Sequence, residues 1–217
     1  MMKKENELPL SKKDYFPKSR MEAFSDGVFA ILITLLVLEL KSPTLKEISN
    51  SKELFDNLLE LGPKFLMAFI SFFTICVIWV NHYRFFKHFK VIDHSILWLN
   101  ALLLLTVTFL PFPTAVLGDY PHNITSILLY GGTMTSMTLV FAFMKIYAIR
   151  EGKMFDDSID PEKFKKNPRR SLYYMRHPFI YLIGTLLCFV SIYISYAVFI
   201  LMPIYHMEPH VSDLSRR

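Results

Sequence analysis

The charged and polar octet Arg20–Gly27 runs directly into the apolar segment Val28–Leu38. Its acidic residue Asp26 lies within a turn or two of hydrocarbon, where a carboxylate is costly unless it finds a partner or faces water. Residues of this kind serve ion pathways, proton relays or helix packing. A solvated helix start is the plainer alternative. The octet is therefore the first candidate site of the chain.

A carboxylate at this depth needs hydrogen-bond donors, and the end of the second apolar run supplies them at the same membrane edge. These donors are Trp79, Asn81, His82 and Arg84, and the role of the histidine depends on its protonation state. Arg20 lies at the same level and can pair with Asp26 of a neighbouring subunit or with polar groups on another helix. The set favours a network that fixes helix geometry over a catalytic dyad, although His82 also fits an ordinary interfacial histidine.

Three histidines, His82, His88 and His94, follow one another at equal spacing. On a helix this spacing places neighbours about 240° apart, so no pair shares the face that i, i+4 zinc ligands require. The two cysteines, Cys76 and Cys188, lie inside apolar runs and behave as small hydrophobes. We therefore predict no enzyme, no metal centre and no bound cofactor.

The composition is that of a membrane protein. The chain has 217 residues, of which 53% are hydrophobic, and a mean hydropathy of +0.33, which is too apolar for an ordinary soluble domain. The net charge of +5 comes from basic residues that flank apolar runs, and no nucleic-acid motif accompanies them. Residues 1–19 lack the apolar core of a secretory signal, so we expect the first apolar run to stay in the mature protein.

Four apolar runs are each near the roughly 20 residues that a helix needs to cross hydrocarbon. They are Phe24–Leu40, Leu61–Val80, Ile96–Val116 and Ile124–Tyr147. The last run, Pro178–Tyr205, is long for one helix and short for two. We predict two short helices that turn near Ser191–Ser195, with a single fifth span as the alternative. The chain is thus expected to be an all-α integral membrane protein with six transmembrane helices in a single domain, residues 1–217.

Basic residues predict the orientation in the bilayer. All but four of the 24 lysines and arginines fall in segments that share one side if the N-terminus is cytoplasmic. The positive-inside rule then places the polar segment 1–19 and the tail 206–217 in the cytoplasm. Segment 42–60 fits an amphipathic helix on the outer surface, and the charged loop 150–170 fits a solvated linker.

The first apolar run predicts a helix with two distinct faces. Ser19 and Glu22 match a capping box, so this helix is expected to begin near Arg20. At about 100° per residue, Leu35 and Leu38 fall within about 40° of Ile31, whereas Asp26 lies about 140° away. Beside this aliphatic stripe runs a row of small residues: Ala23, Gly27, Ala30 and Thr34.

Small rows allow close helix packing in lipid, so copies of this helix can surround a symmetry axis with the aliphatic stripe lining a narrow pore. The alternative is that the stripe faces lipid or a neighbouring helix.

The first span opens with Arg20-x-x-x-Phe24-Ser25-Asp26-Gly27, and Trp79-x-x-His82 closes the second. This combination resembles the family of transmembrane protein 175, the potassium channels of lysosomes and of many prokaryotes. The likeness covers essentially the whole chain by its hydropathy layout. It implies a six-helix unit, four of which surround one pore as a homotetramer. Such channels lack the Thr-Val-Gly-Tyr-Gly filter of ordinary potassium channels, and the sequence contains no such motif.

The resemblance also implies roles for individual residues. Ile31 corresponds to the aliphatic ring at the narrowest constriction, with Leu35 and Leu38 as further rings. Thr34 corresponds to a pore threonine implicated in selectivity. The network that holds the pore helices corresponds to Arg20, Phe24, Ser25, Asp26, Trp79, Asn81 and His82.

The predicted function is that of a potassium-permeable channel in the cell membrane, with potassium ions, the lipid bilayer and further copies of the chain as its partners. A ring of aliphatic side chains gates by dewetting, because water leaves a constriction that is too narrow. The alternative is a proton-coupled transporter or proton pathway that uses Asp26 and the membrane-edge histidines. Carriers usually show broken helices and internal repeats, and neither is evident in the sequence.

Overall fold

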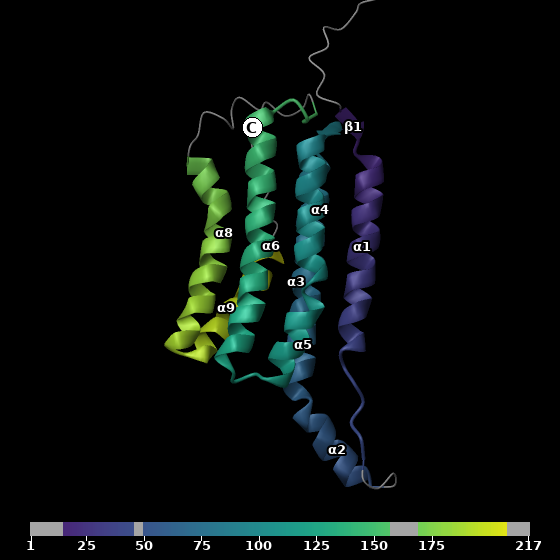
Figure 1. Ribbon diagram of the computed structural model, residues 1–217, viewed down its shortest axis with the longest axis vertical. Coiled ribbons are helices and arrows are strands. Elements are labelled where there is room, and N and C mark those ends of the chain that lie inside the picture. The colour runs from purple at the N-terminus through teal and green to yellow at the C-terminus, as the bar shows by residue number, and fades with distance from the viewer. Residues whose placement is uncertain (1–14, 46–49, 157–168, 208–217) are drawn as a thin grey trace, which may run out of the picture.

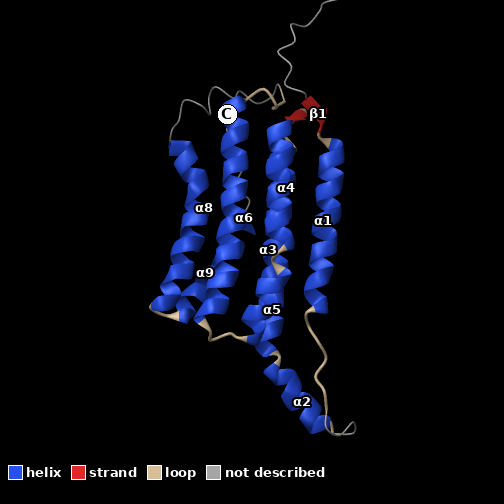
Figure 2. Ribbon diagram, viewed as in Figure 1, coloured by secondary structure: helices blue, strands red, loops and turns tan. Residues whose placement is uncertain are grey.

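The computed structural model describes residues 15–45, 50–156 and 169–207, which form a bundle of helices with a short two-stranded sheet at one end (Figures 1 and 2). The helices are α1 Ser19–Leu38, α2 Ser51–Glu60, α3 Gly62–Phe86, α4 His94–Thr108, α5 Pro111–Asp119, α6 Ile124–Glu151, α8 Arg169–Leu186 and α9 Ile192–Met207, with a 3-10 turn at Leu187–Phe189. The strands are β1 Tyr15–Pro17 and β2 Val91–Asp93. We call the end of the bundle that carries them the β end.

Four helical segments are long and apolar enough to cross a membrane. They are Ser19–Leu38, Gly62–Phe86, His94–Asp119 and Ile124–Glu151. These correspond to the four predicted runs, and the second and fourth extend several residues further towards the β end.

The third segment is two helices joined end to end, whereas a single helix is predicted over Ile96–Val116. The break falls at Phe109–Leu110, immediately before Pro111. Pro111 has no backbone N–H to donate, and it occupies the first turn of α5, where that donor is not required.

The last apolar run forms two helices, α8 and α9, as predicted. The turn falls at Leu187–Ser191 rather than at Ser191–Ser195. Ser195 is buried inside α9, and its hydroxyl donates to the Gly184 carbonyl oxygen at 2.7 Å across the hairpin. Its polar group thus joins the two helices instead of forming the turn.

The β end ties the beginning of α1 to the other helices. Strand β1 pairs antiparallel with β2, and Lys18 Nζ donates to the Phe86 carbonyl oxygen at the end of α3 at 2.7 Å. The expected capping box is wrong, because α1 begins at Ser19 and its cap residue is Lys18, which makes no side-chain capping bond. Glu22 instead forms an ion pair with Lys18 at 3.4 Å.

Asp93 connects two more helices at this end. One carboxylate oxygen accepts from the Ile96 backbone N–H at 2.9 Å and so caps α4. The other accepts from the Tyr147 hydroxyl at 2.5 Å, which holds α6 against α4. The start of the predicted linker 150–170 also packs here, since Met154 and Phe155 are buried, and residues 157–168 lie outside the described part.

At the opposite end, α2 projects beyond the bundle (Figure 1). It forms part of the predicted amphipathic segment, and none of its residues is buried. An ion pair between Lys64 and Asp119 holds the beginning of α3 to the end of α5 at this end.

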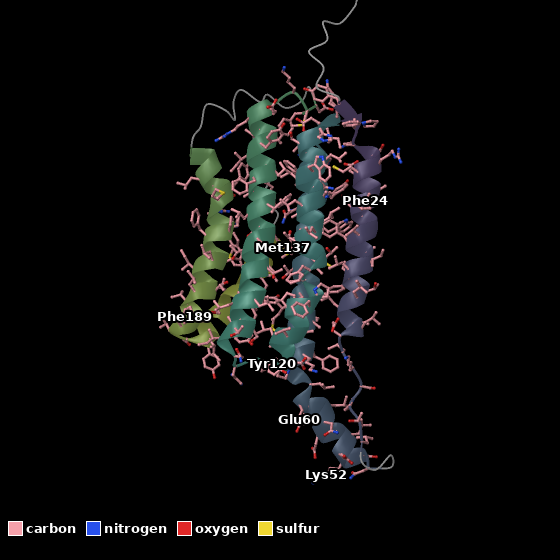
Figure 3. All side chains as sticks on the ribbon, in the orientation of Figure 1. Phe24, Lys52, Glu60, Tyr120, Met137 and Phe189 are labelled. Carbon is pink, nitrogen blue, oxygen red and sulfur yellow. The ribbon has the colours of Figure 1, made fainter. Side chains whose placement is uncertain are left out.

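Helix α1 lies at one edge of the bundle and α8 at the other, with α4 and α6 between them (Figure 1). Among the described elements, α1 packs against α3, α4 and α5. Side chains fill the space between the helices (Figure 3). One side of α1 therefore faces its own subunit, and the other side is left uncovered.

Candidate functional site

The covered face of α1 repeats at helical spacing. Its buried residues are Met21, Ser25, Phe29, Leu32 and Leu36. They recur every three or four positions, as expected for one stripe of a helix packed against its neighbours. Because this buried face is fixed against the bundle, the rotation of α1 is fixed, and so are the side chains that point outwards.

The uncovered face carries the residues predicted to line a pore. Ile31 is 62% exposed, Leu35 41% and Leu38 68%, and Thr34 is also exposed. The Thr34 hydroxyl donates to the Ile31 carbonyl oxygen at 2.6 Å, so its proton is satisfied within the helix. Phe24, 64% exposed, extends this face towards the β end, although it is predicted to belong to the network.

Asp26 is held by a single hydrogen bond from α3. Trp79 Nε1 donates to Asp26 Oδ1 at 2.8 Å. Both side chains are exposed in the subunit, and the contact joins residues from the two ends of the predicted motif. Of the four donors that the sequence offers to this carboxylate, the structure brings Trp79 to it.

His82 belongs to a different, fully buried network. His82 Nε2 lies 2.8 Å from Asn100 Oδ1, and Asn100 Nδ2 donates to Ser25 Oγ at 2.9 Å. Ser25 Oγ in turn donates to the Met21 carbonyl oxygen at 2.8 Å. The rings of His82 and Phe29 meet edge to face, with centroids 5.6 Å apart. This chain of bonds links α1, α3 and α4.

Asn100 is the member of this network that was not predicted from the sequence. It is 2% exposed and stands in the middle of α4, among leucines. A lone amide in a predicted span is a usable signal, because a polar group at that depth needs a partner. The signal does not identify the partners, His82 and Ser25, which lie on α3 and α1.

Two of the predicted network residues lie elsewhere. Arg20 is exposed and makes no hydrogen bond or ion pair with the described residues of its own subunit. Asn81 faces a cavity between α3, α6, α8 and α9. Of the other histidines, His94 accepts a hydrogen bond from Trp98 Nε1 at 2.8 Å. Over the described ranges, no three side chains of His, Cys, Asp or Glu come together as metal ligands.

Comparisons with known proteins connect this geometry to a family. A family model described as the endosomal/lysosomal potassium channel TMEM175 matches residues 20–111, which include the α1 face and both networks. A potassium channel of Chamaesiphon minutus is 38% identical over 189 residues, which are 86% of this chain and 91% of that protein. A potassium channel of Streptomyces collinus is 35% identical over 65% of this chain and 69% of its own length.

Solved structures show the same relationship. The crystal structure of a lysosomal potassium-selective channel TMEM175 homologue from Chamaesiphon minutus superposes with a TM-score of 0.72 at 37% identity. The match covers 87% of this chain and 95% of that one. With this agreement of sequence and fold over nearly the whole length, the chain belongs to the TMEM175 family.

Proposed function

We propose that this chain is the subunit of a potassium channel in which four copies of α1 line one central pore. The proposal rests on the family relationship and on one observation of the structure. The aliphatic stripe of Ile31, Leu35 and Leu38 lies on the side of α1 that its own subunit leaves uncovered, and the adjacent Thr34 is exposed on the same side. This exposed side is where we place the contacts with further copies of the chain.

The row of small residues beside the stripe supports a helix-to-helix contact. Ala23, Gly27 and Ala30 are exposed in the subunit. A methyl group added to Gly27 would meet no atom within 4 Å, so packing inside the subunit does not require glycine there. Small residues let helix backbones approach closely in lipid, which suits a contact between neighbouring α1 helices.

In this arrangement the aliphatic rings are the gate. A ring of four Ile31 side chains excludes water when it is narrow, and a hydrated cation then meets a high barrier. Thr34 adds oxygen ligands, since its proton is donated to the Ile31 carbonyl and its lone pairs remain available. Selectivity for potassium over sodium then comes from the cost of dehydration at the constriction, and we expect it to be moderate.

The six helices α1, α3, α4 with α5, α6, α8 and α9 form the proposed transmembrane unit. Most basic residues of the described part lie at the β end, so we place this end and both termini in the cytoplasm. The proposed location is the cell membrane.

The proton-pathway alternative requires Asp26 and His82 to exchange protons with water. Asp26 is bonded to Trp79, and His82 is bonded to Asn100 inside the bundle. Both groups therefore have structural partners, and neither lies on the stripe.

The decisive experiment is a current measurement on purified protein in planar bilayers with potassium on one side and sodium on the other. We expect the reversal potential of the wild-type current to show a higher permeability to potassium than to sodium. The Ile31→Asn variant replaces the apolar ring by polar side chains that no longer exclude water. It should therefore raise the current and move the reversal potential towards zero. Val37→Asn is the matched control, because Val37 is equally exposed on α1 but lies off the stripe.

Unchanged currents in Ile31→Asn would remove Ile31 from the constriction. A wild-type reversal potential that follows the proton gradient instead would favour the proton pathway.

A further inference from the structure

A cavity of about 180 Å³ lies between α3, α6, α8 and α9. It is on a different face of α3 from the one that carries Trp79 and His82, and so it is separate from the proposed pore. Its middle is apolar, with Ile78, Met134, Met137 and Phe141 in the wall. Such a volume is far more than a single water molecule needs.

The part of the cavity nearest the β end is strongly basic. Arg84 is in the last turns of α3, Lys145 is near the end of α6 and Arg176 is in the first half of α8. His177 lines the same region. No carboxylate is found among the described residues that line the cavity. Positive charge gathered between membrane helices is costly without a compensating anion.

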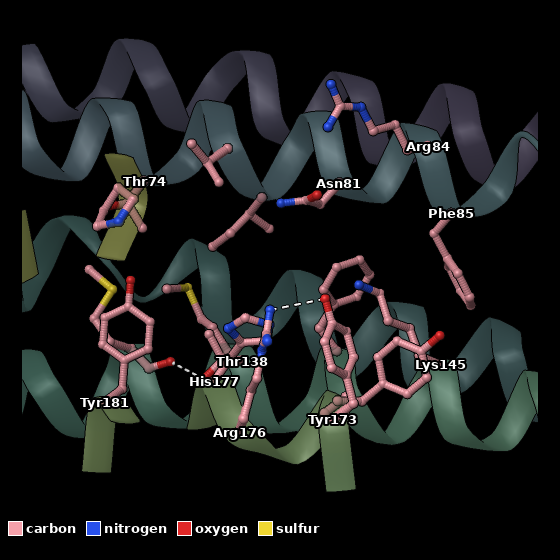
Figure 4. A pocket seen from close by; sticks show the side chains of 18 of the residues that line it. Thr74, Asn81, Arg84, Phe85, Thr138, Lys145, Tyr173, Arg176, His177 and Tyr181 are labelled. Atoms are coloured by element: carbon pink, nitrogen blue, oxygen red, sulfur yellow. Dashed lines mark hydrogen bonds between the residues drawn. The ribbon is translucent and has the colours of Figure 1, made fainter. Parts of the chain in front are cut away.

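The partners of Arg176 do not supply that anion. Its Nε donates to His177 Nε2 at 3.2 Å, and its terminal nitrogen donates to the hydroxyls of Tyr173 and Tyr205 at 3.0 and 3.2 Å. The guanidinium carbon also lies 3.9 Å from the ring centre of Tyr173. None of these groups carries a negative charge, so they orient the guanidinium without neutralising it. Figure 4 shows Arg176 and His177 at the centre of this arrangement.

The other two cations line the same part of the cavity. Arg84 makes no hydrogen bond or ion pair with the described part of the chain. Lys145 Nζ lies 4.3 Å from the ring centre of Phe141 and 5.6 Å from that of Tyr174. The basic region thus has oriented donors, and the apolar region continues directly from it.

We propose that this cavity binds an anionic membrane phospholipid. Its phosphate is held by Lys145 and Arg176, and part of an acyl chain lies along Met134, Met137 and Phe141. Guanidinium groups match phosphate oxygens in geometry and charge, and basic pockets between transmembrane helices suit anionic head groups. A free phosphate would satisfy the cations but leave the apolar wall in contact with water, so a lipid fits the whole cavity better. The inference does not depend on ion conduction.

The test measures lipid retention by the purified full chain in detergent. Native mass spectrometry compares dioleoylphosphatidylglycerol with the zwitterionic dioleoylphosphatidylcholine. We expect retention of the anionic lipid and not of the zwitterionic one. The double variant Lys145→Gln, Arg176→Gln should weaken binding by about fivefold for each side chain removed.

A matched control removes the same charge outside the cavity. Lys87 and Lys153 are exposed, lie at the β end and do not line the cavity. The double variant Lys87→Gln, Lys153→Gln should therefore keep wild-type retention. Ala142→Leu keeps every charge but fills part of the cavity, so it should also reduce retention of the anionic lipid. This variant tests the proposal independently if the charge variant fails to fold.

Two results would overturn the proposal. One is undiminished phosphatidylglycerol retention in Ala142→Leu or in the cavity charge variant. The other is equal thermal stabilisation by millimolar sodium phosphate and by phosphatidylglycerol, which would assign the cations to a free phosphate instead of a lipid.

Discussion

Trp79 of α3 donates its indole N–H to the Asp26 carboxylate of α1 across 2.8 Å. The bond joins the two helices on the side of α1 between its buried face and the proposed pore stripe. We therefore propose that Asp26 holds α1 in position and does not contact the ion. In a tetramer this contact would fix the rotation of each α1 and thereby the direction in which Ile31 points.

Removal of this bond should destabilise the subunit modestly. Because the pair is partly exposed, we expect Asp26→Ala and Trp79→Phe each to cost about 1 kcal/mol, below the usual value for a charged acceptor. In the double variant the two losses should not add, since they remove one interaction. Thermal unfolding in detergent measures all three variants.

Trp98→Phe is the control for that series, because Trp98 donates a hydrogen bond of the same length to His94 within α4. Strictly additive losses for Asp26 and Trp79 would show that the observed bond contributes nothing.

The buried network around Asn100 should be more sensitive. Asn100→Leu leaves His82 Nε2 without its partner in a site where His82 is 2% exposed, and we expect a loss of about 1–3 kcal/mol. Combining it with His82→Phe removes both partners and should recover part of the loss, because no polar atom of that pair is then left unsatisfied. Asn57→Leu, an amide on the projecting helix α2, should have little effect. The thermal midpoint compares the three variants.

Two adjacent glycines in α6 should respond in opposite directions. A methyl group on Gly131 would lie 2.0 Å from Thr185 Oγ1 of α8, whereas one on Gly132 meets no atom within 4 Å. Gly131→Ala forces α6 and α8 apart and should cost about 1–3 kcal/mol. Gly132→Ala should stabilise the helix by about 0.5–1 kcal/mol, because alanine loses less backbone entropy than glycine.

Chemical or thermal unfolding in detergent separates the two glycine variants. Equal effects at both positions would mean that the close approach of α6 and α8 does not limit stability.

His88, just beyond the end of α3, should make stability depend on pH. Partial burial lowers the pKa of His88, and the charges of Lys87 and Lys18 lower it further, against a small opposing effect of Asp156. The unfolded chain then binds a proton more readily than the folded one. Above the usual histidine pKa of about 6.5, His88 is neutral in both states and does not reduce folding stability. As the pH falls towards the lower pKa of the folded state, the unfolded chain takes up the proton first and folding stability decreases.

We therefore expect wild-type stability to fall between about pH 7.5 and pH 5.5, and His88→Gln to reduce that fall. Thermal midpoints at the two pH values give the comparison, and Lys153→Gln serves as a control for a surface charge at the same end. An identical pH dependence in wild type and His88→Gln would contradict the assignment.

Several features of the fold follow from the sequence because they are local. The apolar runs are long enough to fix the four spans, and the spacing of Ile31, Leu35 and Leu38 fixes their common face on α1 once the segment is helical. Proline at position 111 is also a visible local signal, and it could have predicted the break between α4 and α5. By contrast, the capping-box pattern at Ser19 is overridden by Lys18, which is drawn to Glu22 and to the end of α3.

The sequence by itself determined the class of the protein and which residues share the stripe on α1, since hydrophobic length and helical periodicity need no partner. Only the tertiary structure decided how the polar groups are paired. Trp79 reaches Asp26, while His82 turns to Asn100 on α4, because hydrogen bonds between helices depend on helix rotation and depth. The same is true of the basic cavity, because the residues that line it come from separate helices that enclose it only when they pack together.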